Sequence, residues 1–189
     1  MSMAVNPRAK ELNVAYIGGG SRGWAWGFMM DLAMDADMCG TVRLYDIDRS
    51  AAQRNEIIGN KISAHPDAAS RWHYEVSDTL QDALTGADFI VISILPGTFE
   101  EMRSDVHLPE RLGIWQPVGD TVGAGGFMRA MRTVPMFVTI GEAIRDYAPG
   151  AWVINYTNSD GRFILCLRQL REDETEEDMA RRIAASGDR

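Results

Sequence analysis

Three glycines near the start of the chain have the spacing of a phosphate-binding turn. They lie in the segment 18–23, which follows the apolar run 13–17 and precedes a stretch suited to a helix. In such a turn the first glycine permits a tight bend and the second lets the backbone approach a pyrophosphate. The third allows a helix to pack closely on a strand, with its N-terminus towards the anion. The pattern predicts a dinucleotide site made of Gly18, Gly19, Gly20, Ser21, Arg22 and Gly23.

An acidic residue stands where a dinucleotide site needs one. Asp46 follows the apolar run 41–45 and comes 23 residues after Gly23, close to the spacing of roughly 20 residues expected for a carboxylate that binds the adenosine ribose. Because a 2′-phosphate would meet this carboxylate, we expect NAD rather than NADP, although Arg49 nearby weakens that preference. The alternative is a glycine-rich turn of an α/β sheet that binds nothing.

The surrounding sequence alternates between strand-like and helix-like patterns. Strands are expected at 13–17, 41–45, 72–76, 89–95 and 152–156, and helices at 24–34, 50–64, 127–147 and, with Asp78 as its cap, up to Leu84. This order predicts an α/β fold with a Rossmann-like, doubly wound, mostly parallel sheet. Since ligands bind beyond the carboxyl ends of such strands, the segments 18–23, 96–98 and 155–158 should converge on one cleft.

Composition narrows the classes of function. The 189 residues carry a net charge of −8, and no basic stretch could neutralise the phosphates of a nucleic acid or a membrane surface. The two cysteines form no CxxC pair, which fits a reducing compartment. No apolar run reaches the ~20 residues of a membrane span, and residues 1–12 lack a signal-peptide core. We expect a cytoplasmic protein with no nucleic-acid or membrane partner.

The composition changes after Asn158. Between residues 171 and 189, seven acidic side chains stand against four arginines, with few apolar anchors. Such a segment can hardly pack a stable helix. We therefore expect a dinucleotide-binding domain over 1–158 and a divergent acidic tail over 159–189, either disordered or produced by a frameshift.

A second glycine-rich segment, 113–126, is expected to be a shaped loop. Together with five other motifs in the same order, it closely resembles glycoside hydrolase family 4, and most of all the α-galacturonidase and α-glucosidase/α-galactosidase branch. The resemblance covers residues 12–158. The other motifs are Gly18-Gly19-Gly20-Ser21, Leu44-Tyr45-Asp46-Ile47-Asp48, Asp105-Val106-His107-Leu108-Pro109-Glu110, Met131-Arg132-Thr133-Val134-Pro135 and Ile154-Asn155-Tyr156-Thr157-Asn158.

The resemblance implies a particular chemistry. Enzymes of this family are NAD- and manganese-dependent glycosidases that cleave the glycosidic bond by oxidation, elimination and reduction, not with a pair of carboxylates. It implies NAD and Mn²⁺ or another divalent metal in the complete enzyme, a small-molecule glycoside as substrate, and a homo-oligomer. It gives Asp120 the role of raising the basicity of a catalytic tyrosine, and Asn155 and Asn158 a role in substrate binding. The residues alone would make Asp120 a helix cap and Asn158 a turn residue.

Two departures from the family pattern bear on function. Phosphosugar-specific members carry an arginine where this chain has Met102, with Arg103 adjacent. Since an apolar side chain cannot pair with a phosphate, we expect a non-phosphorylated glycoside. The branch that the chain resembles implies an α-galacturonide or a related α-glycoside. The second departure is that Ser159 replaces a proline and no histidine follows His107.

The second departure removes the family's metal ligands and tyrosine base. We expect no metal site in this chain, and a truncated form that is inactive alone. An NAD-dependent dehydrogenase and a non-enzymatic NAD-binding module remain as alternatives.

Overall fold

The computed structural model describes residues 10–119 and 122–157. They form one sheet with the strand order β3-β2-β1-β4-β5, and every neighbouring pair of strands is parallel. The strands are β1 (Lys10–Ile17), β2 (Met38–Tyr45), β3 (Trp72–Val76), β4 (Phe89–Ile92) and β5 (Trp152–Asn155). The chain runs outward from β1 to β3 and then resumes at β4 on the other side of β1. This confirms the predicted Rossmann-like, doubly wound α/β fold.

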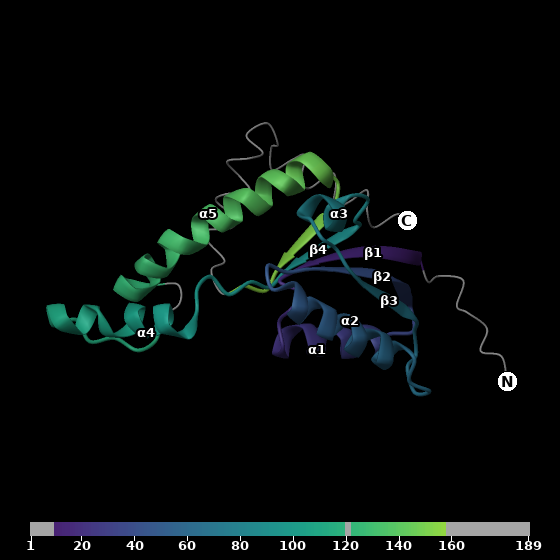
Figure 1. Ribbon diagram of the computed structural model, residues 1–189, viewed down its shortest axis with the longest axis horizontal. Helices are drawn as coiled ribbons and strands as arrows, with labels where there is room; N and C mark the ends of the chain where they lie inside the picture. Colours follow the sequence, from purple (N-terminus) through teal and green to yellow (C-terminus); the bar gives the residue numbers. More distant parts are fainter. Residues whose placement is uncertain (1–9, 120–121, 158–189) are drawn as a thin grey trace.

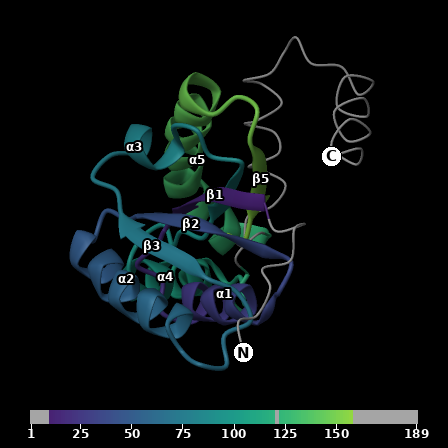
Figure 2. The ribbon, with the colours of Figure 1, turned by 90° about the vertical axis from the view of Figure 1, so that its right-hand side faces the viewer.

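Helices cover both faces of the sheet (Figures 1 and 2). Helices α1 (Gly23–Met34) and α2 (Arg49–Ser63) lie on one face, and α3 (Leu80–Leu84) and the C-terminal half of α5 (Gly123–Tyr147) lie on the other. The buried core is divided in the same way. Tyr16 packs with the α1–α2 side, whereas its neighbour Ile17 packs with the α3–α5 side. Successive strand residues thus bury side chains on opposite faces, as in a sheet covered on both sides.

Small residues let α2 lie close to the sheet. Its buried positions are Ala52, Asn55, Gly59 and Ser63, which recur at helical spacing. A Cβ atom at Gly59 would come within 2.6 Å of the Tyr74 ring, so only glycine fits there. The helix therefore packs directly on β3, and its first turns approach the carboxyl ends of β1 and β2.

A second part of the chain projects from the sheet (Figure 1). We call it the arm: residues 99–119 and 122–134, comprising α4 (Phe99–His107), the 3₁₀ helix η1 (Pro109–Leu112) and the N-terminal half of α5. Helix α4 begins with a capping box. The Thr98 side chain accepts a backbone N–H of the first helical turn, and the Glu101 side chain accepts the backbone N–H of Thr98. Neither core cluster of the described residues includes a residue of the arm.

Several boundaries differ from those expected. The helix cap predicted at Asp78 is Thr79, whose hydroxyl accepts the N–H of Asp82 at 3.0 Å, while Asp78 pairs with Arg49 at 2.6 Å. Strand β4 ends at Ile92 instead of residue 95 because the N–H of Ile94 turns to the Thr157 hydroxyl. Helix α4 and η1 were not predicted.

The glycine-rich segment 113–126 is only partly a loop. Helix α5 begins at Gly123, so four residues predicted as loop are helical. The glycines serve close packing there: a Cβ at Gly125 would lie 3.0 Å from the carbonyl oxygen of Asp105 in α4. The expected acidic tail, 159–189, lies outside the described residues.

Within residues 10–119 and 122–157, no helix combines the length and the apolar character needed to cross a membrane.

Candidate functional site

The glycine turn leads from the end of β1 into α1 and is bound to the end of β2. The N–H groups of Gly18 and Gly19 both donate to the carbonyl oxygen of Tyr45, at 2.9 and 3.0 Å, and Ser21 donates to Gly18 at 3.0 Å. Gly18 has a φ of +90°, and a Cβ there would lie 2.0 Å from the carbonyl oxygen of Ser93. Its predicted role in the tight bend therefore has a physical basis.

The other two glycines of the motif differ from each other. A Cβ at Gly20 would lie 2.6 Å from Ala51 and 2.8 Å from the Asp46 carboxylate. No side chain fits at this position, so the backbone of Gly20 has no side chain of its own between Asp46 and the start of α2. A Cβ at Gly23, by contrast, would have no atom within 4 Å. The prediction that Gly23 permits close helix–strand packing is wrong for this structure. Gly19 instead allows the turn itself to lie close to β2, since its Cβ would lie 2.8 Å from Leu44.

Asp46 reaches from the end of β2 into the turn. One carboxylate oxygen accepts the N–H of Gly20 at 2.8 Å, and the other accepts the N–H of Asp48 at 2.8 Å. An ionised carboxylate has about four acceptor positions, so acceptor capacity is left for a ligand hydroxyl. The sequence-predicted pair of glycine turn and acidic residue is thus in direct contact.

The N-terminus of α1 lacks a cap of its own. Arg22 at the N-cap makes no side-chain capping bond, and no acidic residue lies in the first turn. Helices α2, α3 and α4 are instead capped by Asp48, Thr79 and Thr98. The first N–H groups of a helix have no intrahelical acceptor and carry the positive end of its dipole. An uncapped helix start behind a glycine turn suits a phosphate group.

The acidic cap of α2 lies next to this turn. The hydroxyl of Ser50 and the backbone N–H of Ala51 donate to Asp48 and hold the pKa of its carboxyl below the ordinary value. Asp48 therefore stays ionised beside Asp46. Arg49, the cation that weakened the expected preference for NAD, is engaged with Asp78 at 2.6 Å and so has an acidic partner.

The ends of β1, β4 and β5 meet beside the glycine turn. The N–H of Ile94 donates to the Thr157 hydroxyl at 3.0 Å, and the rings of Trp24 and Tyr156 lie 5.8 Å apart. This agrees with the predicted convergence of segments 18–23 and 155–158 as far as residue 157. Asn158 lies outside the described residues, and the segment 96–98 leads into α4.

Asn155, predicted to bind substrate, is engaged locally. Its amide oxygen accepts the N–H of Thr157 at 3.0 Å, and its amide nitrogen donates to the carbonyl of the same residue at 3.3 Å. One acceptor and one donor position of the amide remain for another group. The side chain therefore shapes the turn after β5 and keeps a polar edge.

A partly buried ion pair joins α4 and α5 in the arm. Arg132 of α5 donates through both terminal nitrogens to the Asp105 carboxylate of α4, one of these bonds at 3.1 Å. Asp105 is 7% exposed. The hydrogen bonds to Asp105 raise the pKa of Arg132 above its ordinary value, so the arginine is firmly charged. Both residues belong to family motifs, but sequence reasoning gave them no role.

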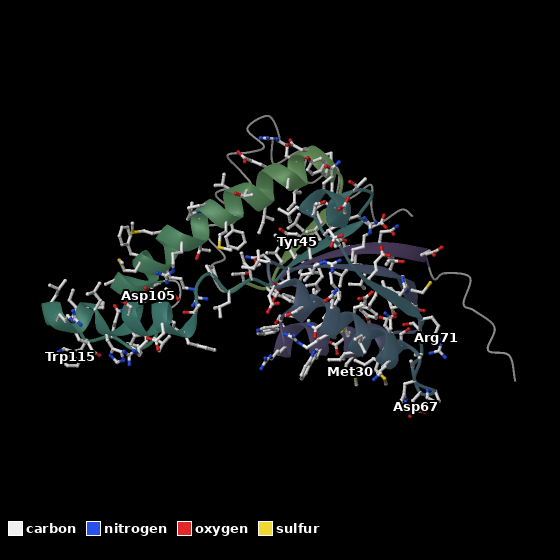
Figure 3. The ribbon with its side chains drawn as sticks, in the orientation of Figure 1. Met30, Tyr45, Asp67, Arg71, Asp105 and Trp115 are labelled. Atoms are coloured by element: carbon white, nitrogen blue, oxygen red, sulfur yellow. The ribbon has the colours of Figure 1, made fainter. Side chains whose placement is uncertain are left out.

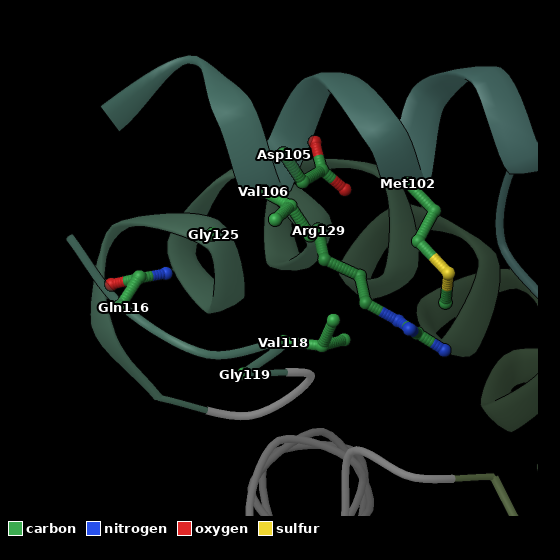
Figure 4. Close-up of a pocket in the computed structure, with 8 residues that line it drawn as sticks. All are labelled: Met102, Asp105, Val106, Gln116, Val118, Gly119, Gly125 and Arg129. Atoms are coloured by element: carbon green, nitrogen blue, oxygen red, sulfur yellow. The ribbon is translucent and has the colours of Figure 1, made fainter. Parts of the chain in front are cut away.

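A small cavity lies inside the arm (Figure 4). Met102 lines it, whereas Arg103 pairs with Glu100 at 3.7 Å and borders a separate surface depression. Gly119 lines the cavity, and the next residue, Asp120, lies outside the described residues. The remaining lining residues are Asp105, Val106, Gln116, Val118, Gly125 and Arg129. Figure 3 places Asp105 and Trp115 on the arm and Tyr45 at the sheet.

Two polar residues at these sites were missed by sequence reasoning. Gln116 accepts the N–H of Ala124 at 3.3 Å and so supplies an acceptor at the start of α5. Asn55 binds the glycine turn from α2. The sequence offers no clear signal for Asn55, because its burial on that helix is decided by the tertiary structure.

The described residues do not fit a metal ion. Over 10–119 and 122–157, no group of three or more His, Cys, Asp or Glu side chains is placed to hold one. His107 pairs with Glu110 at 3.1 Å on an exposed surface.

The arrangement of glycine turn, acidic strand end and following motifs matches one protein family. The family model described as "Family 4 glycosyl hydrolase" matches residues 13–171. The chain belongs to this family. The resemblance inferred from the sequence motifs is thereby confirmed.

The relatives of this chain include α-galacturonidases. The enzyme of Lachnoclostridium phytofermentans is 64% identical over 165 residues, which cover 87% of this chain and 35% of the relative. The enzyme of Bacillus subtilis is 57% identical over 148 residues, covering 78% of this chain and 32% of the relative. The chain thus spans about a third of the length of these family 4 relatives.

Solved structures show the same fold. The crystal structure of the Bacillus subtilis family 4 protein LplD is 53% identical with a TM-score of 0.79, covering 86% of this chain and 36% of that one. A 6-phospho-α-glucosidase from gut microorganisms, solved in complex with NAD and Mn²⁺, is 27% identical with a TM-score of 0.72, covering 87% and 37%. A lactate dehydrogenase of Eimeria maxima, 18% identical with a TM-score of 0.56 over 89% and 42%, shares the fold alone.

Proposed function

We propose that the domain over residues 1–158 binds NAD at the glycine turn. The observation that carries this proposal is the uncapped start of α1 behind a turn that also contacts Asp46. A pyrophosphate would accept the N–H groups at the start of α1, and bare backbone at Gly20 leaves room for its approach. The remaining acceptor positions of Asp46 would take the ribose hydroxyls. The NAD-bound relative of known structure supports this assignment.

We further propose that the complete enzyme hydrolyses the O-glycosyl bond of a non-phosphorylated α-glycoside, namely an α-galacturonide. The α-galacturonidase relatives support the sugar class. Met102, which stands where phosphosugar-specific members of the family carry an arginine, supports the absence of a phosphate. Asp120, Asn155 and Asn158 keep their proposed roles in tyrosine basicity and substrate binding.

In this proposal NAD supplies a hydride acceptor for the sugar. The chain's own contribution is to hold the cofactor: backbone N–H groups bind its phosphates, and the carboxylate of Asp46 orients its ribose. The described residues do not fit the Mn²⁺ of the family, so we derive no step through a metal. That the 189-residue chain alone releases no p-nitrophenol from α-glycosides stays a prediction, as do the homo-oligomer and the cytoplasmic location.

The NAD site is tested by calorimetric titration of Asp46→Ala. We expect NAD affinity to fall by about tenfold or more, because hydrogen bonds to a charged group contribute roughly 1.5–3 kcal/mol. Asp88→Ala is the matched control. Its carboxylate also accepts a backbone N–H, that of Asn13 at 2.8 Å, but at the amino end of β4. Equal NAD affinity in the two variants would contradict the assignment.

A further inference from the structure

One buried side chain of α2 reaches into the glycine turn. Asn55 is 3% exposed, and its amide nitrogen donates to the carbonyl oxygens of Gly19 at 2.7 Å and Ser21 at 2.8 Å. Each of the two N–H bonds of the amide is therefore donated to a different carbonyl of the turn. A side chain 36 residues away in the sequence thus fixes the backbone that the proposed function assigns to phosphate binding.

A neighbouring tryptophan sets the orientation of this amide. The indole N–H of Trp26 in α1 donates to the amide oxygen of Asn55 at 2.8 Å. Because an indole nitrogen only donates, the atom that faces it must be the oxygen. The NH₂ group of Asn55 is consequently turned towards the glycine turn. Three of the four hydrogen-bonding positions of the amide are occupied, which leaves it one stable orientation.

The two carbonyls determine where the adjacent N–H groups point. In a trans peptide the C=O and the following N–H point in opposite directions, and the described residues contain no cis peptide. The peptide between Gly19 and Gly20 is held on both sides, by Asn55 at its oxygen and by Asp46 at its N–H. In the peptide between Ser21 and Arg22, Asn55 holds the oxygen, so the N–H of Arg22 points away from α2.

The same contacts have an electrostatic consequence. A peptide carbonyl carries partial negative charge and would repel a pyrophosphate that approached it. Asn55 turns the carbonyls of Gly19 and Ser21 inward and hydrogen-bonds both, so that the N–H of Arg22 faces the ligand in place of a carbonyl. Preorganised donors bind an anion without the cost of rearranging at the moment of binding.

We propose that Asn55 is the positioning residue of the pyrophosphate site, holding the turn with its carbonyls inward and the N–H of Arg22 outward. This rests on the proposed binding of NAD at the glycine turn. Asn55 would not touch the cofactor itself. It acts through the backbone, with Trp26 fixing its amide.

The test uses two asparagines of the same helix. Asn60 also makes two hydrogen bonds to the backbone of one residue, but that residue lies in β3. Its amide nitrogen donates to the carbonyl of Tyr74 at 2.7 Å, and its amide oxygen accepts the N–H of Tyr74 at 3.1 Å. We expect Asn55→Ala to weaken NAD binding by about tenfold or more in calorimetry, the loss of two hydrogen bonds at the turn. Asn60→Ala should lower the thermal midpoint comparably and change NAD affinity less than about twofold.

Adenosine and ADP-ribose separate positioning from a general loss of structure. Adenosine uses the Asp46 side of the site and has no pyrophosphate, so Asn55→Ala should leave its affinity unchanged while weakening ADP-ribose. Trp26→Phe keeps the amide and removes its anchor, and should give the same pattern more weakly. If Asn55→Ala does not fold, Trp26→Phe replaces it in the same comparison of adenosine with ADP-ribose. Equal losses for adenosine and ADP-ribose, or unchanged NAD affinity in Asn55→Ala, would overturn the proposal.

Failure of NAD binding in the wild type would sink the proposed function separately. The positioning claim is then decided by amide hydrogen exchange in the 189-residue chain. Faster exchange at Gly20 and Ser21, whose N–H groups are bound to Asp46 and to the carbonyl of Gly18, in Asn55→Ala but not in Asn60→Ala supports it. Unchanged exchange at both residues refutes it.

Discussion

Beneath the glycine turn the buried side chains are mostly apolar, whereas in the arm charged side chains are buried and many apolar ones are exposed. Tyr16 and Leu44 are fully buried beneath the turn. In the arm the buried residues include Asp105 and Arg129, while Trp115 is 78% exposed. Other exposed apolar side chains of the arm are Phe99, Leu108, Leu112, Ile114, Val118, Val122, Phe127 and Met131.

The two regions therefore hold their shapes by different means. The sheet region has a core on each face and polar contacts that complete its turn. The arm is held by an ion pair and by glycines that allow close backbone contact. The comparison predicts that stability is set in the sheet region and that the arm contributes little to it.

The sharpest way to break this comparison uses one substitution at two places on α5. Phe137 is fully buried against the sheet and Phe127 is 64% exposed on the arm. We expect Phe137→Ala to lower the free energy of unfolding by about 3–5 kcal/mol, through lost burial and the cavity left behind. Phe127→Ala should change it by less than about 0.5 kcal/mol. Urea titrations followed by circular dichroism measure both, and comparable losses would refute the comparison.

A second prediction concerns the ion pair of the arm. Asp105→Asn leaves the guanidinium of Arg132 without its charged partner, and we expect a local cost of about 1–3 kcal/mol, since that arginine is partly exposed. The effect should appear as faster hydrogen exchange in α4. Exchange in β1 and β4 should be unchanged, because neither core cluster contains the arm. Loss of protection throughout the sheet would show that the arm and the sheet unfold as one unit.

The smallest effect expected is a dependence on acid. The hydroxyl of Thr98, followed by its backbone N–H, lowers the pKa of Glu101 below the ordinary 4.5. A lowered pKa means that the capping box stabilises the folded arm above pH 4.5 and loses this contribution as the pH falls through the folded value. The amide hydrogens of α4 should therefore exchange faster in acid than the pH dependence of their intrinsic exchange rates predicts.

Glu101→Gln is the matched variant for this measurement. Glutamine retains the capping geometry and does not titrate, so the acid-dependent part should vanish. An acid response in α4 that persists in Glu101→Gln would assign it to another group. Asp48 of the glycine-turn region gives the parallel case, since its pKa is lowered by Ser50.

The sequence by itself determined the features that depend on neighbouring residues. Apolar runs separated by helix-like stretches predicted the five parallel strands. The glycine spacing from Gly18 to Gly23, together with Asp46, predicted a phosphate-binding turn, and the structure places this turn in contact with the Asp46 carboxylate. Glycine spacing and strand periodicity are local properties. The ordered motifs likewise sufficed to identify the family.

Only the tertiary structure decided which distant side chains complete the turn and the arm. Asn55 meets Gly19 across 36 residues, and Arg132 meets Asp105 across 27. The helical start of α5 at Gly123 also depends on such contacts, because its glycines fit against α4 and Gln116. In the sequence alone, Asn55, Asp105 and Arg132 look like ordinary polar positions of a helix. The glycines at the start of α5 look like part of a flexible loop. Their roles arise from which elements the topology brings together, and no short stretch of sequence encodes that.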